Sequence, residues 1–227
     1  MAHRTITILL IIGFIAALGL YQLKNRVWLQ KSKVTLQIKK PHQGLSQLKD
    51  ETGSGDIHVS LVDTEYVSRL KTLDNMLAAN NRNTYALYRR AQLYADKGDI
   101  EKALSDYSRI IDINKDMDSY FNRGLLFMAQ QKYDMAIIDF SQVIEMAPES
   151  IDSLSNRGSA YLLIGKLDMA LNDYSTALGI DSKDSDLYFN RGVVYLRMKE
   201  KDKAEEDFKR AASMGNSMAR EYLGWEE

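Results

Sequence analysis

Four aspartates that recur at a fixed interval are the residues of this chain best suited to chemistry. Each is followed by an aromatic residue, and the four are Asp106, Asp139, Asp173 and Asp207. Carboxylates brought together can transfer protons or bind a metal ion. The spacing is 33 residues once and 34 residues thereafter, which favours a structural role, since a catalytic pair has no reason to repeat with this period. We therefore predict no catalytic residue and a protein that is not an enzyme.

The remaining candidates for a chemical site have the wrong composition or spacing. His3, His42 and His58 lack the i, i+4 spacing of a zinc site, and the chain has no cysteine. The segment Gly53-Ser54-Gly55 is too short for a phosphate-binding loop and lacks the Lys-Ser/Thr that should follow it. The sequence thus predicts no metal, no cofactor and no small-molecule substrate.

The aspartates belong to a longer pattern that occurs four times between Thr84 and Met218. Three copies contain an Asn-Arg-Gly triplet, and the first copy has Arg90-Ala91 at the same place. An aromatic residue follows three residues after each small residue, and an alanine stands three residues before each aspartate. The triplets begin at Asn122, Asn156 and Asn190, and the alanines are Ala103, Ala136, Ala170 and Ala204.

The spacing within each copy predicts two helices. Gly124, Phe127 and Met128 lie three or four residues apart, as residues on one helix face do, and the same spacing starts again at Ala136. The segment Gln131-Lys132 lies between the two halves, where the first and third copies have Gly98 and Gly165, and such a turn signal separates two helices. One helix pair cannot bury its apolar face alone, so we expect neighbouring pairs to stack.

This pattern of small, aromatic and alanine positions, with Pro148 closing the second copy, resembles the tetratricopeptide repeat. The resemblance implies an all-α fold, a right-handed superhelical solenoid of antiparallel helix pairs. A repeat domain would cover residues 84–214. By register its copies span 84–116, 117–150, 151–184 and 185–218. Capping helices over 64–83 and 215–227 would cover its apolar ends.

In that family the first helix of each repeat lines a concave groove that binds protein segments, which implies a protein partner for this chain. A subclass holds a terminal carboxylate with Lys, Asn and Arg; here the basic positions hold residues such as Tyr88 and Asp152, so that activity is not implied. By register the groove comprises Tyr88, Gln92, Phe121, Asn122, Leu125, Met128, Asn156, Ser159, Leu162, Phe189, Asn190, Val193, Leu196 and Arg197.

The apolar residues of this set are expected to stand free of the repeat core, so the groove would accept an apolar peptide or helix. Its occupant would be a partner protein or this chain's own segment Val34–Ile38. The three asparagines would hold the occupant's backbone. The alternative for the asparagines is local hydrogen bonding within their own helices.

The N-terminal region predicts a membrane anchor. Thr5 to Leu23 are nineteen residues without charge, long enough as a helix for a bilayer core of about 30 Å. We assign a transmembrane helix to residues 1–23; the alternative is a cleaved signal peptide with a site near Ala17–Gly19. Six basic residues follow the span and favour a cytoplasmic repeat domain, although they would also bind anionic lipid head groups. They are Lys24, Arg26, Lys31, Lys33, Lys39 and Lys40.

Residues 24–63 are interpreted as a basic juxtamembrane tether. Val34–Ile38 and Ile57–Leu61 alternate apolar and polar residues, which gives two short strands as the alternative. An isolated two-stranded hairpin is marginally stable in water, so we favour the tether.

The charge distribution argues against nucleic acid as a partner. Residues 1–42 hold seven of the 30 Lys and Arg residues and none of the 31 acidic residues, so the repeat region is net acidic. The sequence therefore predicts a membrane-anchored scaffold whose groove binds a partner protein and helps to assemble a complex at the membrane. The alternative is a constitutive structural subunit of a larger membrane protein complex.

Overall fold

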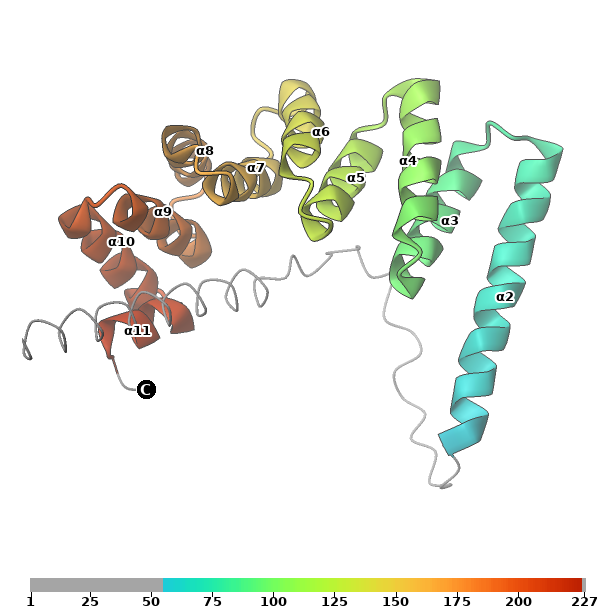
Figure 1. Ribbon diagram of the computed structural model, residues 1–227, viewed down its shortest axis with the longest axis horizontal. Helices are drawn as coiled ribbons and strands as arrows, with labels where there is room; N and C mark the ends of the chain where they lie inside the picture. Colours follow the sequence, from blue (N-terminus) through green and yellow to red (C-terminus); the bar gives the residue numbers. More distant parts are fainter. Residues whose placement is uncertain (1–54, 226–227) are drawn as a thin grey trace, which may run out of the picture. The chain divides into compact units, whose positions relative to one another are not determined.

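Helices make up nearly all of the part of the chain that the structure describes. The computed structural model describes residues 55–225, with side chains described from residue 64 onward. Over this range it contains ten α-helices and no strand (Figure 1). The first is α2, Gly55–Ala79, and the last is the short α11, Ser217–Leu223. The predicted all-α fold is confirmed, and the handedness of the superhelix stays a prediction.

Eight helices between these two form four pairs of consecutive helices. Each helix packs against the helices that precede and follow it, and α5 also contacts α7, which contacts α9. The first helices of successive pairs therefore lie side by side and share one face. The pairs are α3 (Thr84–Lys97) with α4 (Ile100–Asn114), α5 (Met117–Ala129) with α6 (Tyr133–Met146), α7 (Ile151–Leu163) with α8 (Leu167–Ile180), and α9 (Ser185–Arg197) with α10 (Lys201–Ser213).

The turn inside each pair uses the same backbone conformation. Gly98, Gln131, Gly165 and Lys199 occupy equivalent positions and have φ angles of 83°, 60°, 79° and 67°. This left-handed region is open to glycine and costly for residues with a Cβ atom. Two of the four turns therefore fit their residue without strain, and Gln131 and Lys199 hold an unfavourable conformation.

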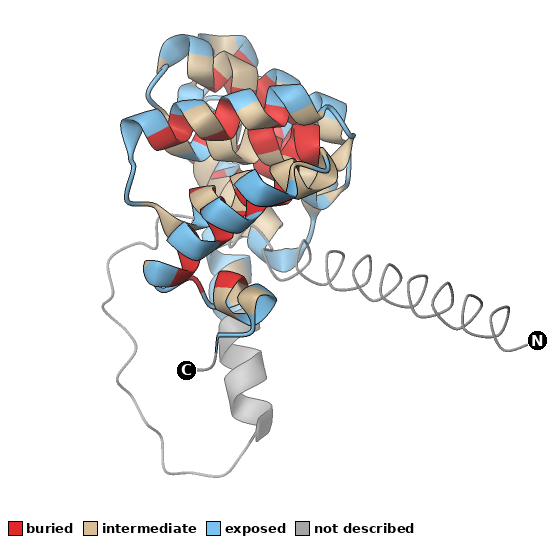
Figure 2. Ribbon diagram, turned by 90° about the vertical axis from the view of Figure 1, so that its left-hand side faces the viewer, coloured by how far each residue is buried: buried red, intermediate tan, exposed pale blue. Residues whose placement is uncertain are grey.

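In the second, third and fourth pairs, the glycine of the first helix lies against the aromatic ring of the second helix. A Cβ atom added to Gly124 would come 2.8 Å from Cε1 of Phe140, and one added to Gly192 would come 2.8 Å from Cε1 of Phe208. Glycine is needed at these positions for the two helices to approach each other. In Figure 2 the buried residues lie where neighbouring helices meet and the exposed residues lie on the outer faces.

Helix α2 corrects the prediction for the segment before the repeats. It begins at Gly55, so the tether favoured up to residue 63 is wrong for residues 55–63, and so is its alternative, a strand over Ile57–Leu61. The helix expected from residue 64 therefore starts earlier than predicted. Ile57 and Leu61 are four residues apart, a spacing that fits one face of a helix as well as an alternating strand. The helix satisfies the backbone hydrogen-bonding groups within the segment itself, whereas a strand needs a neighbouring strand, and none is found among residues 55–225. Leu73 and Leu77 are buried at the end nearest α3.

The predictions for the N-terminal region lie outside the described residues. These are the membrane span over 5–23, the tether up to residue 54 and the strand over Val34–Ile38. Within residues 55–225, no helix combines the length and the apolar character that crossing a bilayer requires.

Candidate functional site

The fourteen predicted groove residues all lie on the first helices of the four pairs, and none of them is exposed. Nine are half-buried and so partly accessible to a ligand. These are Tyr88, Gln92, Phe121, Met128, Asn156, Ser159, Asn190, Leu196 and Arg197. The other five, Asn122, Leu125, Leu162, Phe189 and Val193, are buried.

The expectation that the apolar residues of this set stand free of the core is wrong for four residues that are buried and for Phe121, which packs against the core; the four are Leu125, Leu162, Phe189 and Val193. Phe189 is only 7% exposed, and its ring centre lies 5.3 Å from that of Phe208 in the second helix of the same pair. Phe121 contacts Phe140 in the same way, with 5.8 Å between ring centres. The aromatic residue three positions before the glycine points toward the partner helix as well as the groove, so it packs in the core of its own repeat.

Two of the three asparagines use their side-chain amides within the fold. Nδ2 of Asn122 donates to the carbonyl oxygen of Asp118 at 2.7 Å and to the Tyr88 hydroxyl at 3.1 Å. Nδ2 of Asn156 donates to the carbonyl oxygen of Asp152 at 2.8 Å. Local hydrogen bonding, the alternative for these residues, therefore accounts for both Nδ2 groups. Oδ1 of Asn190 differs, because it is buried and has no hydrogen-bond partner within the described residues.

The third pair makes the centre of this face polar. Where other first helices carry an aromatic residue, α7 has Ser155, whose carbonyl oxygen accepts a 2.9 Å hydrogen bond from Oγ of Ser159. The hydroxyls of Ser159 and Tyr174 are 2.8 Å apart. Burial raises the pKa of Tyr174 above its ordinary value of 10.0, so its phenol keeps its proton further into the alkaline range than an exposed tyrosine does. The face thus places small hydroxyl-bearing side chains between Phe121 and Phe189.

The periodic aspartates are structural, as their spacing predicts. Each accepts two hydrogen bonds from an arginine sixteen residues earlier. In the second pair, Nε and Nη2 of Arg123 donate to the two carboxylate oxygens of Asp139 at 2.9 and 2.7 Å. We call these four pairs the arginine ladder. Its other members are Arg90 with Asp106, Arg157 with Asp173, and Arg191 with Asp207. The pairing itself was not predicted, although an arginine recurs sixteen residues before each aspartate in the sequence.

The ladder holds carboxylates inside the fold. Burial raises the pKa of Asp139, and the hydrogen bonds from Arg123 act in the opposite direction. The same contact raises the pKa of Arg123. A guanidinium stabilises the charge of a carboxylate through two parallel hydrogen bonds, which the ammonium group of lysine cannot form with the same geometry. Both oxygens of each aspartate therefore already accept hydrogen bonds from an arginine. No group of three or more potential metal ligands is found among the described residues.

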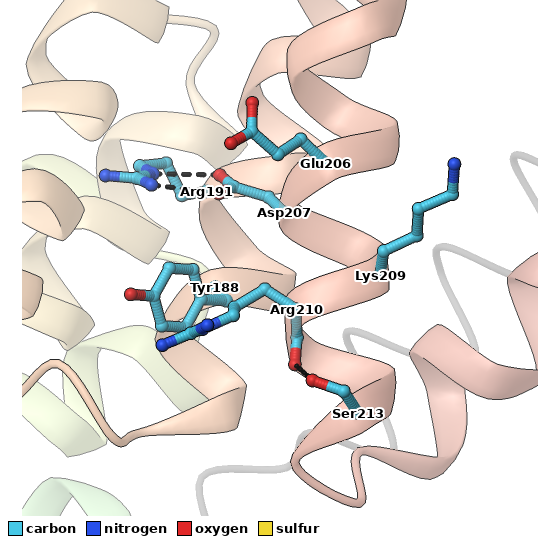
Figure 3. A pocket seen from close by; sticks show the side chains of 7 residues that line it. All are labelled: Tyr188, Arg191, Glu206, Asp207, Lys209, Arg210 and Ser213. Atoms are coloured by element: carbon cyan, nitrogen blue, oxygen red, sulfur yellow. Dashed lines mark hydrogen bonds and ion pairs between the residues drawn. The ribbon is translucent and has the colours of Figure 1, made fainter.

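A pocket that the sequence analysis did not identify lies on the fourth pair, between side chains of α9 and α10. Figure 3 shows the residues that line it, which are Tyr188, Arg191, Glu206, Asp207, Lys209, Arg210 and Ser213. None of them belongs to the predicted groove. Three of the seven are basic, although one of these, Arg191, is bonded to Asp207.

The repeat region matches a known family. Residues 84–117, 118–150 and 185–215 each match the family described as "Tetratricopeptide repeat", and residues 158–199 match the one described as "TPR repeat". The first two matched segments begin where α3 and α5 begin, to within one residue.

Solved structures share the same fold at low sequence identity. YrrB, described in its title as "a TPR protein with an unusual peptide-binding site", superposes with a TM-score of 0.65 at 18% identity, over 74% of this chain and 87% of that chain. MamA from Desulfovibrio magneticus superposes with a TM-score of 0.63 at 17% identity, over 70% and 91%. Identities this low show the fold alone.

Two curated relatives match part of the repeat region. DnaJ homolog subfamily C member 3 of Gallus gallus is 32% identical over 74 residues, which are 33% of this chain and 15% of the relative. The UDP-N-acetylglucosamine–peptide N-acetylglucosaminyltransferase of Giardia intestinalis is 31% identical over 87 residues, which are 38% and 5%. The chain thus spans a small fraction of the length of either relative.

Proposed function

Because this chain carries tetratricopeptide repeats between residues 84 and 215, we propose that it is a scaffold whose first-helix face binds a segment of a partner protein. The observation that carries this proposal is the Oδ1 atom of Asn190, buried on that face without a hydrogen-bond partner in residues 55–225. An unsatisfied buried acceptor costs about 1–3 kcal/mol. A backbone N–H of a bound segment, reached when the amide reorients, would supply the missing donor.

The partly accessible residues define what the segment should be. Four half-buried residues can make apolar contacts with a ligand while they keep their packing within the repeats. They are Tyr88, Phe121, Met128 and Leu196. Between them α7 presents Asn156 and hydroxyl groups, which bond to a peptide backbone or to polar side chains. An extended segment with apolar side chains at intervals fits this alternation.

Acidic residues at the start of the first helices indicate the charge that a bound segment should carry. Asp118, Asp152 and Asp186 occupy the same position in three successive pairs, and all three are exposed. They favour a segment that also carries Lys or Arg, because opposite charges steer association and fix register. The chain's own basic tether has this character too, so it is the competing occupant.

A double variant tests the binding face. Asn156→Ala with Asn190→Ala should weaken co-purification of the partner about tenfold, as expected for the loss of one or two hydrogen bonds. Asn172→Ala is the matched control, because Asn172 is exposed on α8, outside the first helices. Equal partner recovery from the double variant and the control would count against this face.

We further propose that residues 5–23 anchor the scaffold in a membrane and that the repeats lie on the cytoplasmic side. The support is sequence-based: nineteen uncharged residues followed by six Lys or Arg residues. The full chain should stay in the membrane fraction after alkaline carbonate washing. Release by carbonate, or a mature N-terminus near Leu20, would eliminate the anchor.

The proposal assigns no catalytic activity to the chain. The aspartates that recur with the repeats are bonded to arginines. The match to the N-acetylglucosaminyltransferase covers 5% of that enzyme and lies in the repeats, so it says nothing about transfer chemistry. Tetratricopeptide repeats are typically non-catalytic interaction scaffolds, which agrees with this proposal.

A further inference from the structure

The ladder arginines of the first three helix pairs make a hydrogen bond that the arginine of the fourth pair lacks within the described residues. In the first three, Nη1 of the arginine reaches a side chain on the preceding helix: Arg90 to Asp74 at 2.7 Å, Arg123 to Ser108 at 2.9 Å and Arg157 to Ser141 at 3.0 Å. Arg191 bonds Asp207 through Nε and Nη2, but its Nη1 has no hydrogen-bond partner among residues 64–225. One donor of this guanidinium is therefore available in the fourth pair.

A second guanidinium with no carboxylate partner lies beside it. Arg210 stacks on the ring of Tyr188, with its guanidinium carbon 5.9 Å from the ring centre, and that of Arg191 is 5.6 Å from the same centre. No ion pair to Arg210 is present within the described residues. Its counterpart in the first pair, Arg109, bonds the carbonyl oxygen of Asn81 at 2.7 Å. Of these two equivalent arginines, Arg109 therefore donates a hydrogen bond to the backbone, whereas the Arg210 guanidinium makes no hydrogen bond or ion pair within the described residues.

The free donors of this pocket extend in one direction. In Figure 3 the Tyr188 hydroxyl, the outer end of the Arg191 guanidinium and the guanidinium of Arg210 extend to the same side, whereas Lys209 points away. Lys209 is paired with Glu205 at 2.7 Å. Among the lining carboxylates, Asp207 is already neutralised by Arg191, and Glu206 is exposed. Among the lining residues, Arg210 is thus the cation without a carboxylate partner within the described residues, and it lies on the side that carries the free donors.

We propose that this pocket of α9 and α10 binds a phosphate group, held by Nη1 of Arg191, the guanidinium of Arg210 and the hydroxyl of Tyr188. Guanidinium groups match the geometry of phosphate oxygens and donate charge-assisted hydrogen bonds to them. Donors from three separate side chains suit a group with three terminal oxygens better than a carboxylate with two. Tyr188 supports both arginines through its ring and adds a donor of its own. The site lies outside the first-helix groove and does not depend on it.

Nuclear magnetic resonance of the arginine side chains tests the site directly. The full chain, labelled with ¹⁵N-arginine in detergent micelles, is titrated with inorganic phosphate at constant ionic strength while the Nε–H signals are followed. The Arg191 and Arg210 signals should shift together and saturate. Arg210→Gln should weaken phosphate binding about tenfold, which is the loss of one charge-assisted hydrogen bond. Glu206→Gln should strengthen it, because a repelling charge at the rim is removed.

The matched control is Arg109→Gln, at the equivalent position of the first pair, which should leave phosphate affinity unchanged. Acetate should bind more weakly than phosphate, and equal binding would overturn the assignment of phosphate. A short phosphoserine peptide that binds tighter than inorganic phosphate would identify a phosphorylated protein as the source, and equal affinity would identify the free ion. Shifts that do not saturate, or equal losses in Arg210→Gln and Arg109→Gln, would overturn the site.

Discussion

Arg157 and Asp173 join the two helices of the third pair through two parallel hydrogen bonds. Nε and Nη2 of Arg157 donate to the two carboxylate oxygens of Asp173, at 2.9 and 2.8 Å. The Asp173 side chain is 2% exposed and that of Arg157 is 18% exposed. The same relationship recurs in every pair, so the ladder forms a row of buried charge-assisted hydrogen bonds along the repeats.

Breaking one of these pairs from one side should be costly. Arg157→Met leaves Asp173 buried without its cation, and we expect the free energy of unfolding to fall by about 3–5 kcal/mol. The double variant Arg157→Met with Asp173→Leu removes both charges and should be more stable than Arg157→Met alone. Urea unfolding followed by circular dichroism measures both. A double variant that is less stable than the single one would contradict a buried unpaired charge as the cause.

Glycine substitutions should separate close packing from helix propensity. Gly192→Ala places a Cβ atom 2.8 Å from Phe208 and should lower stability by about 1–3 kcal/mol through overpacking. Gly179→Ala in α8 is the control, since its Cβ atom would meet nothing within 4 Å and should gain up to about 1 kcal/mol of helix propensity. Thermal melts of both variants should move in opposite directions. Melts that shift equally would argue against the close contact with Phe208.

The helix pairs could be predicted from the sequence, and the features that could not be predicted have physical reasons. The spacing of Gly124 from Phe127 predicts helices, because the small and large residues that pack must share one face. Phe189 does not stand free in the groove, because its burial depends on where Phe208 of the neighbouring helix lies, and local spacing does not encode that position. The helix over residues 55–63 was not predicted, because residues four apart, such as Ile57 and Leu61, satisfy both the helical and the alternating pattern.

The site was less predictable than the fold. A groove position is defined by how far successive pairs rotate against one another, and a small rotation moves a residue such as Leu125 from the surface into the core. The ladder partners were visible only as a second period in the sequence. The proposed phosphate pocket depends on Nη1 of Arg191 having no hydrogen-bond partner among residues 64–225, which only the contacts of the folded chain reveal.

Turn geometry gives a prediction of increased stability. Lys199 has a φ of 67°, at the position where Gly98 and Gly165 occur in other pairs. Lys199→Gly relieves the left-handed strain and should raise the free energy of unfolding by about 1 kcal/mol. Lys199→Ala keeps the strain and is the control, so the difference between the two in urea unfolding reports the backbone effect alone. A glycine variant no more stable than the alanine variant would contradict the strain.

Alkaline pH should destabilise the first pair through Tyr107. Burial, with smaller effects of Tyr88 and Asp96, raises the pKa of this phenol above its ordinary value of 10.0. The unfolded chain therefore loses this proton first, and the contribution present below pH 10 declines as pH rises toward the raised folded-state pKa. Tyr107→Phe should lose less stability above pH 10 than the unaltered chain, as measured by urea unfolding at a series of pH values. Identical pH profiles would show that Tyr107 is not responsible.

The central claim, that the first-helix face holds a protein segment, is tested most directly by photo-crosslinking in native membranes. Benzoylphenylalanine is placed at Gln92 or Asn156 on that face, and at Asn172 on α8 as the control, and the attached peptides are identified by mass spectrometry. We predict that the two face positions attach to neighbouring residues of one extended segment with apolar and basic side chains, and that Asn172 does not attach to it. Adducts with residues 24–54 would identify the chain's own tether as the occupant. The same partner peptide attached through Asn172, or no adduct from either face position, would contradict the account.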